Sequence, residues 1–190
     1  MDTNKKIVAI ESHVKSIMQI MGMNLKDDSL KDTPKRVAKM WVNELFSGLH
    51  TLPPVVKIFK NSMGYDQMLV EHNIIVTSVC EHHWQPITGK CHIGYIPDKY
   101  VVGLSKFHRI VRHFAAMPQM QERLGKQIAE HLMKTIKTED VAVVLQCEHG
   151  CCKNRGVRDN ESFTSTADLH GAFKNQVVRS EFYNLINQKL

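Results

Sequence analysis

Apolar residues recur with two different periods along the chain, and the change of period separates predicted helices from predicted strands. In residues 4–22 they fall every three or four positions, which is typical of one face of an amphipathic helix. A similar spacing predicts helices at 105–117 and 118–137. Residues 68–80 and 89–98 are instead rich in β-branched and aromatic residues, which favours two long strands joined by a turn.

The remaining segments add helices at the N-terminus and strands farther along. Thr33 is a good N-cap and Pro34 suits a first helical position, so a second helix is predicted to run to a stop at Gly48. Further predictions are strands at 53–59, 140–149 and 161–169 and a closing helix at 176–188. This order favours an α+β protein with an antiparallel sheet and segregated helices. It also predicts an N-terminal helical extension, residues 1–50, followed by a second domain, residues 51–190.

Composition narrows the class of protein. Hydrophobic residues make up 43% of the chain and charged residues 23%, which is ordinary for a globular protein. No stretch approaches the roughly 18 apolar residues of a membrane span, and the N-terminus lacks the apolar region of a secretion signal. A cytoplasmic protein without a membrane partner is therefore expected. The odd number of cysteines, five, disfavours a disulfide framework, and a net charge of +6 suits an anionic partner.

The stretch "SVCEHHW" raises the question of a metal site. Cys80 and His83 have C-x-x-H spacing at the end of a predicted strand, where a thiolate and an imidazole can converge on zinc. A second cluster, "CEHGCC", ends another predicted strand and can supply a third ligand. Three ligands and a water are typical of catalytic zinc. A closed site that uses both Cys151 and Cys152 stays open as an alternative.

Two more histidines, His82 and His149, flank these ligand candidates. Because imidazole titrates near neutral pH, each can serve as a general acid or base beside the metal. The alternative is a hydrogen-bonding role around the ligands. The pattern assigns no chemistry to the remaining candidates His92, His108, His113, His131 and His170.

A group of basic and hydroxyl side chains indicates an anion site. Ser105, Lys106 and Arg109 lie at a predicted helix N-terminus, where free backbone N–H groups already favour an anion. They can grip a phosphate chain, and Arg155 can bring positive charge to the rim of the metal site. A solvated basic face and an ordinary turn arginine are the alternatives.

Gln121 and Glu122 lie near the start of the next predicted helix. A carboxylate can accept hydrogen bonds from the N1–H and exocyclic amine of guanine, and a glutamine amide can contact the same base. Glutamate is also favourable near a helix N-terminus without any ligand. Together with an open zinc site, these residues indicate hydrolytic chemistry on a purine nucleotide.

Several longer motifs resemble one family. They are "DTPKRVAKMWVNELFSGL", "SVCEHHWQPITGKCHIGYIP", "VVGLSKFHRIVRHFAAMPQMQERLGKQIAEHL" and "VAVVLQCEHGCCKNRGV", followed by "SFTSTADLHGAF". From about Lys31 to Phe173 the chain is similar to GTP cyclohydrolase I of the pterin-forming, zinc-dependent type. The resemblance implies the tunnelling fold (T-fold) and a homo-oligomer, usually a decamer, with active sites at subunit interfaces. It implies the conversion of GTP and water to 7,8-dihydroneopterin triphosphate and formate, the first step of pterin and tetrahydrofolate biosynthesis.

The resemblance also assigns roles to particular residues. It implies that the zinc ligands are Cys80, His83 and Cys151 and that the acid–base residues are His82 and His149. It implies that the triphosphate is bound by Arg36, Ser105, Lys106, Arg109 and Arg155. The guanine base is expected to be recognised by Gln121 and Glu122. Cys152 departs from the pattern, because methionine is usual there. A fourth sulfur ligand at this position is therefore a hypothesis.

Three other interpretations compete with this one. A zinc-stabilised nucleic-acid-binding module would have compact ligand pairs, whereas His83 and Cys151 stand 68 positions apart, so no nucleic-acid partner is expected. A nitrile-reducing relative would use a catalytic cysteine and lack the zinc set. A degenerate paralogue would have lost ligands or histidines, and none is missing here.

Overall fold

The structure, a computed structural model, describes residues 2–188, in which a five-stranded sheet carries most of the core. The strands are β2 (Leu69–Cys80), β3 (Pro86–Tyr95), β5 (Pro118–Gln119), β6 (Val141–His149) and β7 (Thr164–Leu169). Their order is β5-β2-β3-β6-β7, and every pairing is antiparallel except the short parallel pair β2–β5. A separate two-stranded sheet pairs β1 (Ile58–Lys60) with β4 (Tyr100–Val102). The α+β class and the largely antiparallel sheet are confirmed.

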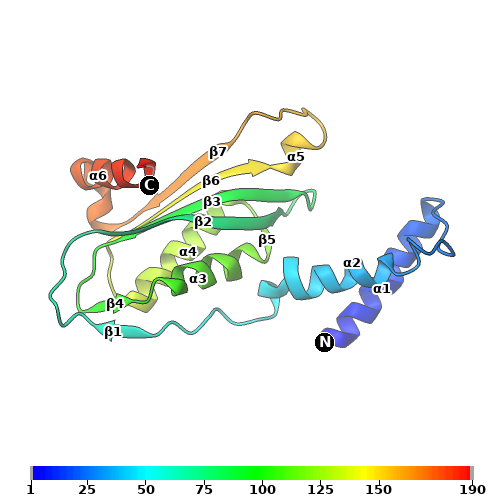
Figure 1. The fold of residues 1–190 in the computed structure, drawn as a ribbon, viewed down its shortest axis with the longest axis horizontal. Helices are drawn as coiled ribbons and strands as arrows, with labels where there is room; N and C mark the ends of the chain where they lie inside the picture. The colour runs from blue at the N-terminus through cyan, green and yellow to red at the C-terminus, as the bar shows by residue number, and fades with distance from the viewer. Residues whose placement is uncertain (1, 189–190) are drawn as a thin grey trace. The chain divides into compact units, whose positions relative to one another are not determined.

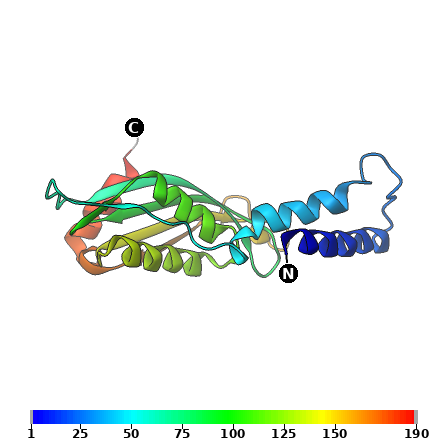
Figure 2. The same ribbon diagram turned by 90° about the horizontal axis from the view of Figure 1, so that it is seen from below.

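Helices cover the two faces of the large sheet unequally. The helices after residue 100 are α3 (Ser105–Ala115), α4 (Gln121–Ile136), α5 (Gly150–Lys153), a 3-10 turn (Gly171–Lys174) and α6 (Gln176–Asn187). α3 and α4 run along one face, and α6 packs on the other (Figures 1 and 2). None of the described helices is both long and apolar enough to span a membrane.

Strand β6 is buried on both faces of the sheet and contributes to both hydrophobic clusters. Val143 and Leu145 point into the cluster formed with α3 and α4, while Ala142 and Val144 point into the cluster formed with α6. A strand that is buried on both faces needs a continuous apolar run, and "VAVVL" supplies it. The rigid strand then ends at His149, beside the predicted metal ligands.

The chain divides into two units, residues up to Thr51 and residues from Leu52 onward. The first contains α1 (Thr3–Ile20), α2 (Thr33–Met40), a π-helical turn (Trp41–Leu45) and a 3-10 turn (Ser47–Leu49). The predicted N-cap at Thr33 is wrong, because Asp32 occupies that position and Thr33 is already helical.

The predicted helix at 118–137 begins later than the sequence indicates. Pro118 and Gln119 form strand β5, and α4 starts at Gln121. The cause is tertiary pairing: β5 lies parallel to the end of β2, and the Glu81 N–H donates to the Gln119 carbonyl at 3.1 Å. Strand pairing therefore overrides the helix-opening preference of proline.

One buried histidine, His92, and two half-buried ones, His113 and His131, make the stability of the fold sensitive to acid. Burial is the main cause that lowers the pKa of His92, His113 and His131. The neighbouring His113 and Lys134 lower the pKa of His131 further. Unfolded histidines bind protons as the pH falls below about 6.5, and these three resist protonation when folded. The free energy of unfolding is therefore expected to decrease as the pH falls from about 7.5 to about 5.5. Urea unfolding at both pH values measures this change.

Two variants test whether His131 causes part of this pH dependence of the free energy of unfolding. His131→Gln is expected to reduce the pH dependence, because the His131 Nε2 atom is buried without a hydrogen-bond partner among the described residues. His13→Gln, on the exposed side of α1, should leave it unchanged. Equal pH dependence in all three proteins would contradict the assignment.

Candidate metal centre

The turn between β2 and β3 holds two of the three predicted ligands. Its backbone closes through hydrogen bonds from the Cys80 N–H to the Gln85 carbonyl, at 2.8 Å, and from the Trp84 N–H to the Cys80 carbonyl, at 2.9 Å. Trp84 has a φ of 52°, in the left-handed region that few residues other than glycine occupy. This tight closure brings His83 back over the strand end, next to Cys80.

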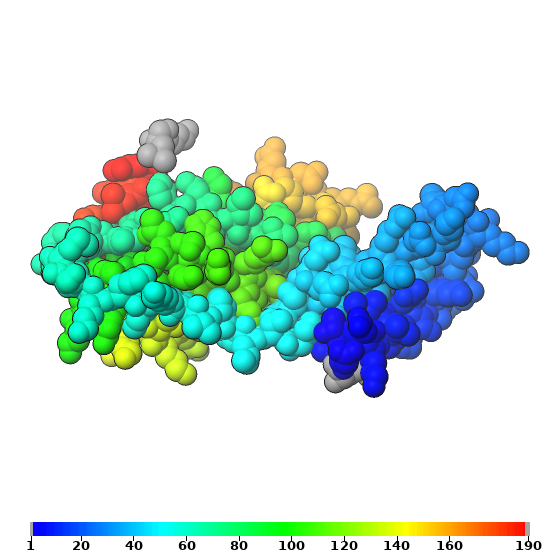
Figure 3. All heavy atoms as spheres, turned by 60° about the horizontal axis from the view of Figure 1, so that its bottom comes forward, coloured from blue at the N-terminus to red at the C-terminus, as the bar shows by residue number. Residues whose placement is uncertain are grey.

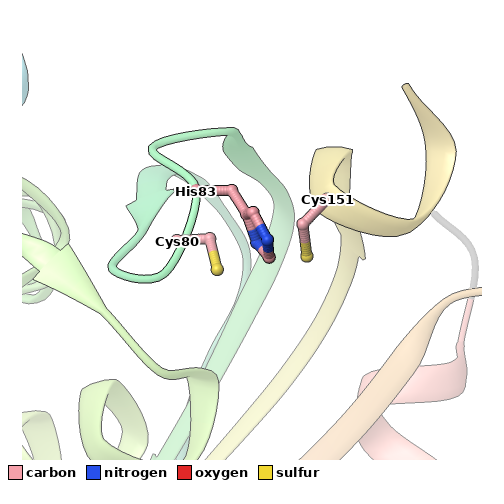
Figure 4. Close-up of side chains that lie close together, drawn as sticks. All are labelled: Cys80, His83 and Cys151. Atoms are coloured by element: carbon pink, nitrogen blue, oxygen red, sulfur yellow. The ribbon is translucent and has the colours of Figure 1, made fainter. Parts of the chain in front are cut away.

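Cys151 reaches the same point from β6. Antiparallel pairing sets Ile87 opposite His149, so the end of β6 lies beside the start of β3. The short helix α5 follows, and its Cys151 side chain points toward Cys80 and His83 (Figure 4). The ligand atoms of these three side chains lie within 4.8 Å of one another. The structure therefore brings together the three residues that the sequence predicts as metal ligands.

The donor set fits zinc by its chemistry. Two thiols and one imidazole are typical zinc ligands, and three protein ligands leave one position open. Burial and the neighbouring Cys80 and Cys152 thiols raise the pKa of Cys151 to about 11. Its proton must therefore leave when a metal binds. Cys152 is exposed and lies outside the group of three.

The two predicted acid–base histidines are each near one of these ligand candidates in the sequence and differ in their environment. His82 is exposed, with its Nδ1 atom 3.8 Å from the Cys80 sulfur. His149 is half-buried, and its Nε2 atom lies 2.8 Å from the Gln121 Oε1 atom. Burial lowers the pKa of His149, and the nearby Glu122 carboxylate opposes that shift. His82 therefore lies beside one of the three ligand candidates, and His149 stands two positions before another, Cys151, at the end of β6.

The two predicted guanine readers differ in their environment. Glu122 is exposed in the first turn of α4, where its carboxylate is available to a ligand. Gln121 is 1% exposed, and its amide contacts protein groups on both β6 and β7. Direct contact of the Gln121 side chain with a base stays a prediction that these contacts do not support.

Arg155 is the predicted phosphate contact nearest to the metal ligands. It is exposed in the segment after α5, and its guanidinium lies 3.1 Å from the His83 Nε2 atom. Figure 3 shows this segment, coloured yellow to orange, at the surface of the molecule. Arg155 therefore brings positive charge to the rim of the centre.

The predicted phosphate contacts on α3 do not lie beside the metal ligands of the same chain. The Ser105, Lys106 and Arg109 side chains lie near the start of α3, where His108 contacts Glu71 at 3.0 Å. Glu71 and Cys80 are separated by nine positions of β2, a length of about 30 Å. A further predicted contact, Arg36, belongs to the N-terminal unit, where it pairs with Asp32 at 3.6 Å.

An arginine that no pattern in the sequence singles out, Arg123, holds the turn that carries two of the ligands. Arg123 donates hydrogen bonds to the Glu81 carboxylate at 2.5 Å and to the Pro118 carbonyl at 2.8 Å. It also donates to the Gln119 side chain at 3.0 Å. Glu81 lies directly after Cys80, so the network ties the turn to the start of α4. The sequence does not indicate this contact, because Arg123 and Glu81 are 42 positions apart.

Loss of the Arg123 hydrogen bonds is expected to weaken metal binding at this centre. Arg123→Met should weaken zinc affinity about 10-fold or more, since groups that hold the ligands contribute roughly that much. Competition with a chromophoric chelator measures the affinity. Lys126→Met, which removes an exposed cation one turn further along α4, is the control and should bind zinc normally. Equal affinity in both variants would contradict the role of Arg123.

Three ligand candidates, two thiols and one imidazole, with two further histidines close to them in the sequence, fit a hydrolytic metal centre better than a four-ligand structural one. A model of the GTP cyclohydrolase I family matches residues 10–187. The chain is 48% identical over 183 residues to GTP cyclohydrolase 1 of Flavobacterium johnsoniae, covering 96% of this chain and 82% of that protein. For GTP cyclohydrolase 1 of Aeromonas hydrophila, the identity is 47% over 184 residues, covering 96% and 84%. The chain belongs to the GTP cyclohydrolase I family and is a hydrolase.

Proposed function

We propose that the protein converts GTP and water to 7,8-dihydroneopterin triphosphate and formate, at a centre that holds zinc. The observation that carries this proposal is the convergence of Cys80, His83 and Cys151 within 4.8 Å. It occurs in a chain whose family membership rests on nearly its whole length. The reaction opens the imidazole ring of guanine, so it needs activated water and proton transfer at one place.

The side chains around the centre have distinct roles in this reaction. Zinc, when bound, supplies the Lewis-acid chemistry that activates water at neutral pH. His149 protonates the ring nitrogen as the bond between that nitrogen and C8 breaks, and His82 is the second acid–base group. Glu122 accepts hydrogen bonds from the N1–H and the amino group of guanine and so directs C8 toward the centre. Two hydrolytic steps consume two waters, and closure of the new ring returns one.

The sheet supports a T-fold oligomer in which chains pair edge to edge. Within residues 2–188, β2 pairs on its outer side only through Val79 and Cys80, and β7 has no strand on its outer side. Open strand edges favour pairing with another chain. A second copy can also bring the Ser105, Lys106 and Arg109 group to the metal ligands, which one chain does not. The decamer stays a prediction from the family resemblance.

Incubation of the zinc-loaded protein with GTP tests the proposed reaction. Formate and the fluorescent pterin that forms after oxidation are quantified together, and equal amounts are expected. Formate without pterin would limit the activity to the two hydrolytic steps, without the later rearrangement and closure of the new ring. Neither product, from protein that binds both zinc and GTP, would contradict the proposal and favour a binding-only paralogue.

A further inference from the structure

The buried amide of Gln121 connects three elements beside the metal centre. Gln121 is the first residue of α4 and is 1% exposed. Its nitrogen, Nε2, lies 3.1 Å from the Leu145 carbonyl on β6 and 3.0 Å from the Thr164 carbonyl on β7. The Thr166 hydroxyl lies 3.0 Å from the same nitrogen. Every polar atom of this side chain therefore has a protein partner.

These contacts leave only one orientation for the amide. The carbonyl oxygens of Leu145 and Thr164 can only accept hydrogen bonds, so the atom that faces them must be the NH₂ group. A flipped amide would set three oxygens against one another in a buried place, where an unsatisfied polar group costs about 1–3 kcal/mol. The Gln121 Oε1 atom must consequently face His149, at 2.8 Å.

The fixed oxygen determines which nitrogen of His149 carries the hydrogen. An amide oxygen only accepts, so His149 Nε2 must donate. In the neutral imidazole the other nitrogen, Nδ1, then has a free lone pair. His149 ends β6, directly before the helix that carries Cys151, so the direction of its ring decides what the free nitrogen can reach.

We propose that Gln121 is a positioning residue that orients the His149 ring and keeps its hydrogen on Nε2, so that Nδ1 is the atom that exchanges protons with the substrate. Gln121 thus acts on catalysis through His149 and does not read the base. This inference rests on the proposed function, because it assigns His149 an acid–base role in that reaction.

The test compares Gln121→Met with the wild-type enzyme in steady-state kinetics on GTP. The thioether has a similar length but no strong hydrogen-bond acceptor. We expect kcat to fall about 10- to 100-fold, while KM stays within about twofold. In a His149→Ala background, Gln121→Met should cause no further loss, because residues that act as one unit are not additive.

Three outcomes would overturn the proposal. One is that Gln121→Met raises KM and leaves kcat unchanged, and also changes the preference for GTP over inosine 5′-triphosphate. Inosine 5′-triphosphate lacks the amino group of guanine. This result would mean that Gln121 contacts the base. A second is that Gln121→Met lowers kcat in the His149→Ala background by as large a factor as it does in the wild-type enzyme. The third is an unchanged kcat. If the wild-type enzyme itself forms no product, the proposed function has failed, which is distinguishable from all three.

Two further variants separate positioning from general support of the fold. Thr166→Val removes one of three acceptors around an NH₂ group that has two hydrogens, so the amide keeps its orientation and kcat should change less than about twofold. In Gln121→Glu, burial beside the Leu145 and Thr164 carbonyls favours the protonated carboxyl, whose hydroxyl donates to one of them while its other oxygen still accepts from His149. This variant should therefore retain more kcat than Gln121→Met. If Gln121→Met does not fold, the glutamate variant carries the test. A kcat for Gln121→Glu reduced more than about 100-fold in folded protein would contradict the proposal.

Discussion

Cys151→Ser is expected to abolish both zinc retention and formate release. A serine hydroxyl does not deprotonate to a ligand near neutral pH, so only Cys80 and His83 would remain of the three donors within 4.8 Å. Without the metal, the pKa of the attacking water is no longer lowered toward neutrality, and the rate should fall on the order of 10³-fold or more. Elemental analysis after gel filtration gives the zinc content, and the coupled formate and pterin assay gives the rate.

The neighbouring cysteine provides the control. Cys152 is exposed and not part of the three-residue group, so Cys152→Ser should keep its zinc and keep its rate within about twofold. Loss of zinc in Cys152→Ser as well would favour the closed, four-ligand site that the sequence left open. Full zinc content and full activity in Cys151→Ser would contradict the proposed ligand set. Thermal unfolding of both variants shows whether either change acts through folding.

The metal ligands could be predicted from sequence because each belongs to a local pattern at a strand end. Cys80 and His83 share one turn, and Cys151 follows a strand whose continuous apolar run is easy to recognise. Antiparallel pairing of β3 with β6 then brings the two strand ends together. The pattern did not show the closure of the turn, which depends on the left-handed Trp84.

Partners that are distant in sequence and brought together only by packing could not be predicted in the same way. Arg123 reaches Glu81 across 42 positions, and Gln121 reaches Thr166 across 45. Their side chains are polar and lie near a helix start, so the sequence favours ligand binding or capping for them. The burial of Gln121 becomes visible only when β6 and β7 lie under α4. The same packing converts Pro118 from a helix start into a strand residue.

Two inactive variants are expected to regain activity when they assemble together. One is Cys151→Ser, which lacks a metal ligand. The other is Lys106→Ala/Arg109→Ala, which lacks two of the predicted triphosphate contacts. These groups are separated by about 30 Å along β2 of one chain. A complete site that uses both must therefore combine the metal ligands of one chain with the α3 residues of another.

Random assembly of the two variants in equal amounts predicts the recovered activity. A site is complete only when its metal-binding chain carries Cys151 and its phosphate-binding chain carries Lys106 and Arg109, which occurs in about one quarter of the sites of a closed ring. Mixed oligomers, isolated through two different affinity tags after co-expression, should therefore show about one quarter of wild-type kcat per site. Each variant expressed alone with both tags is the control. Activity no higher than in these controls would mean that the two groups never serve one site, and would contradict an active site shared between chains.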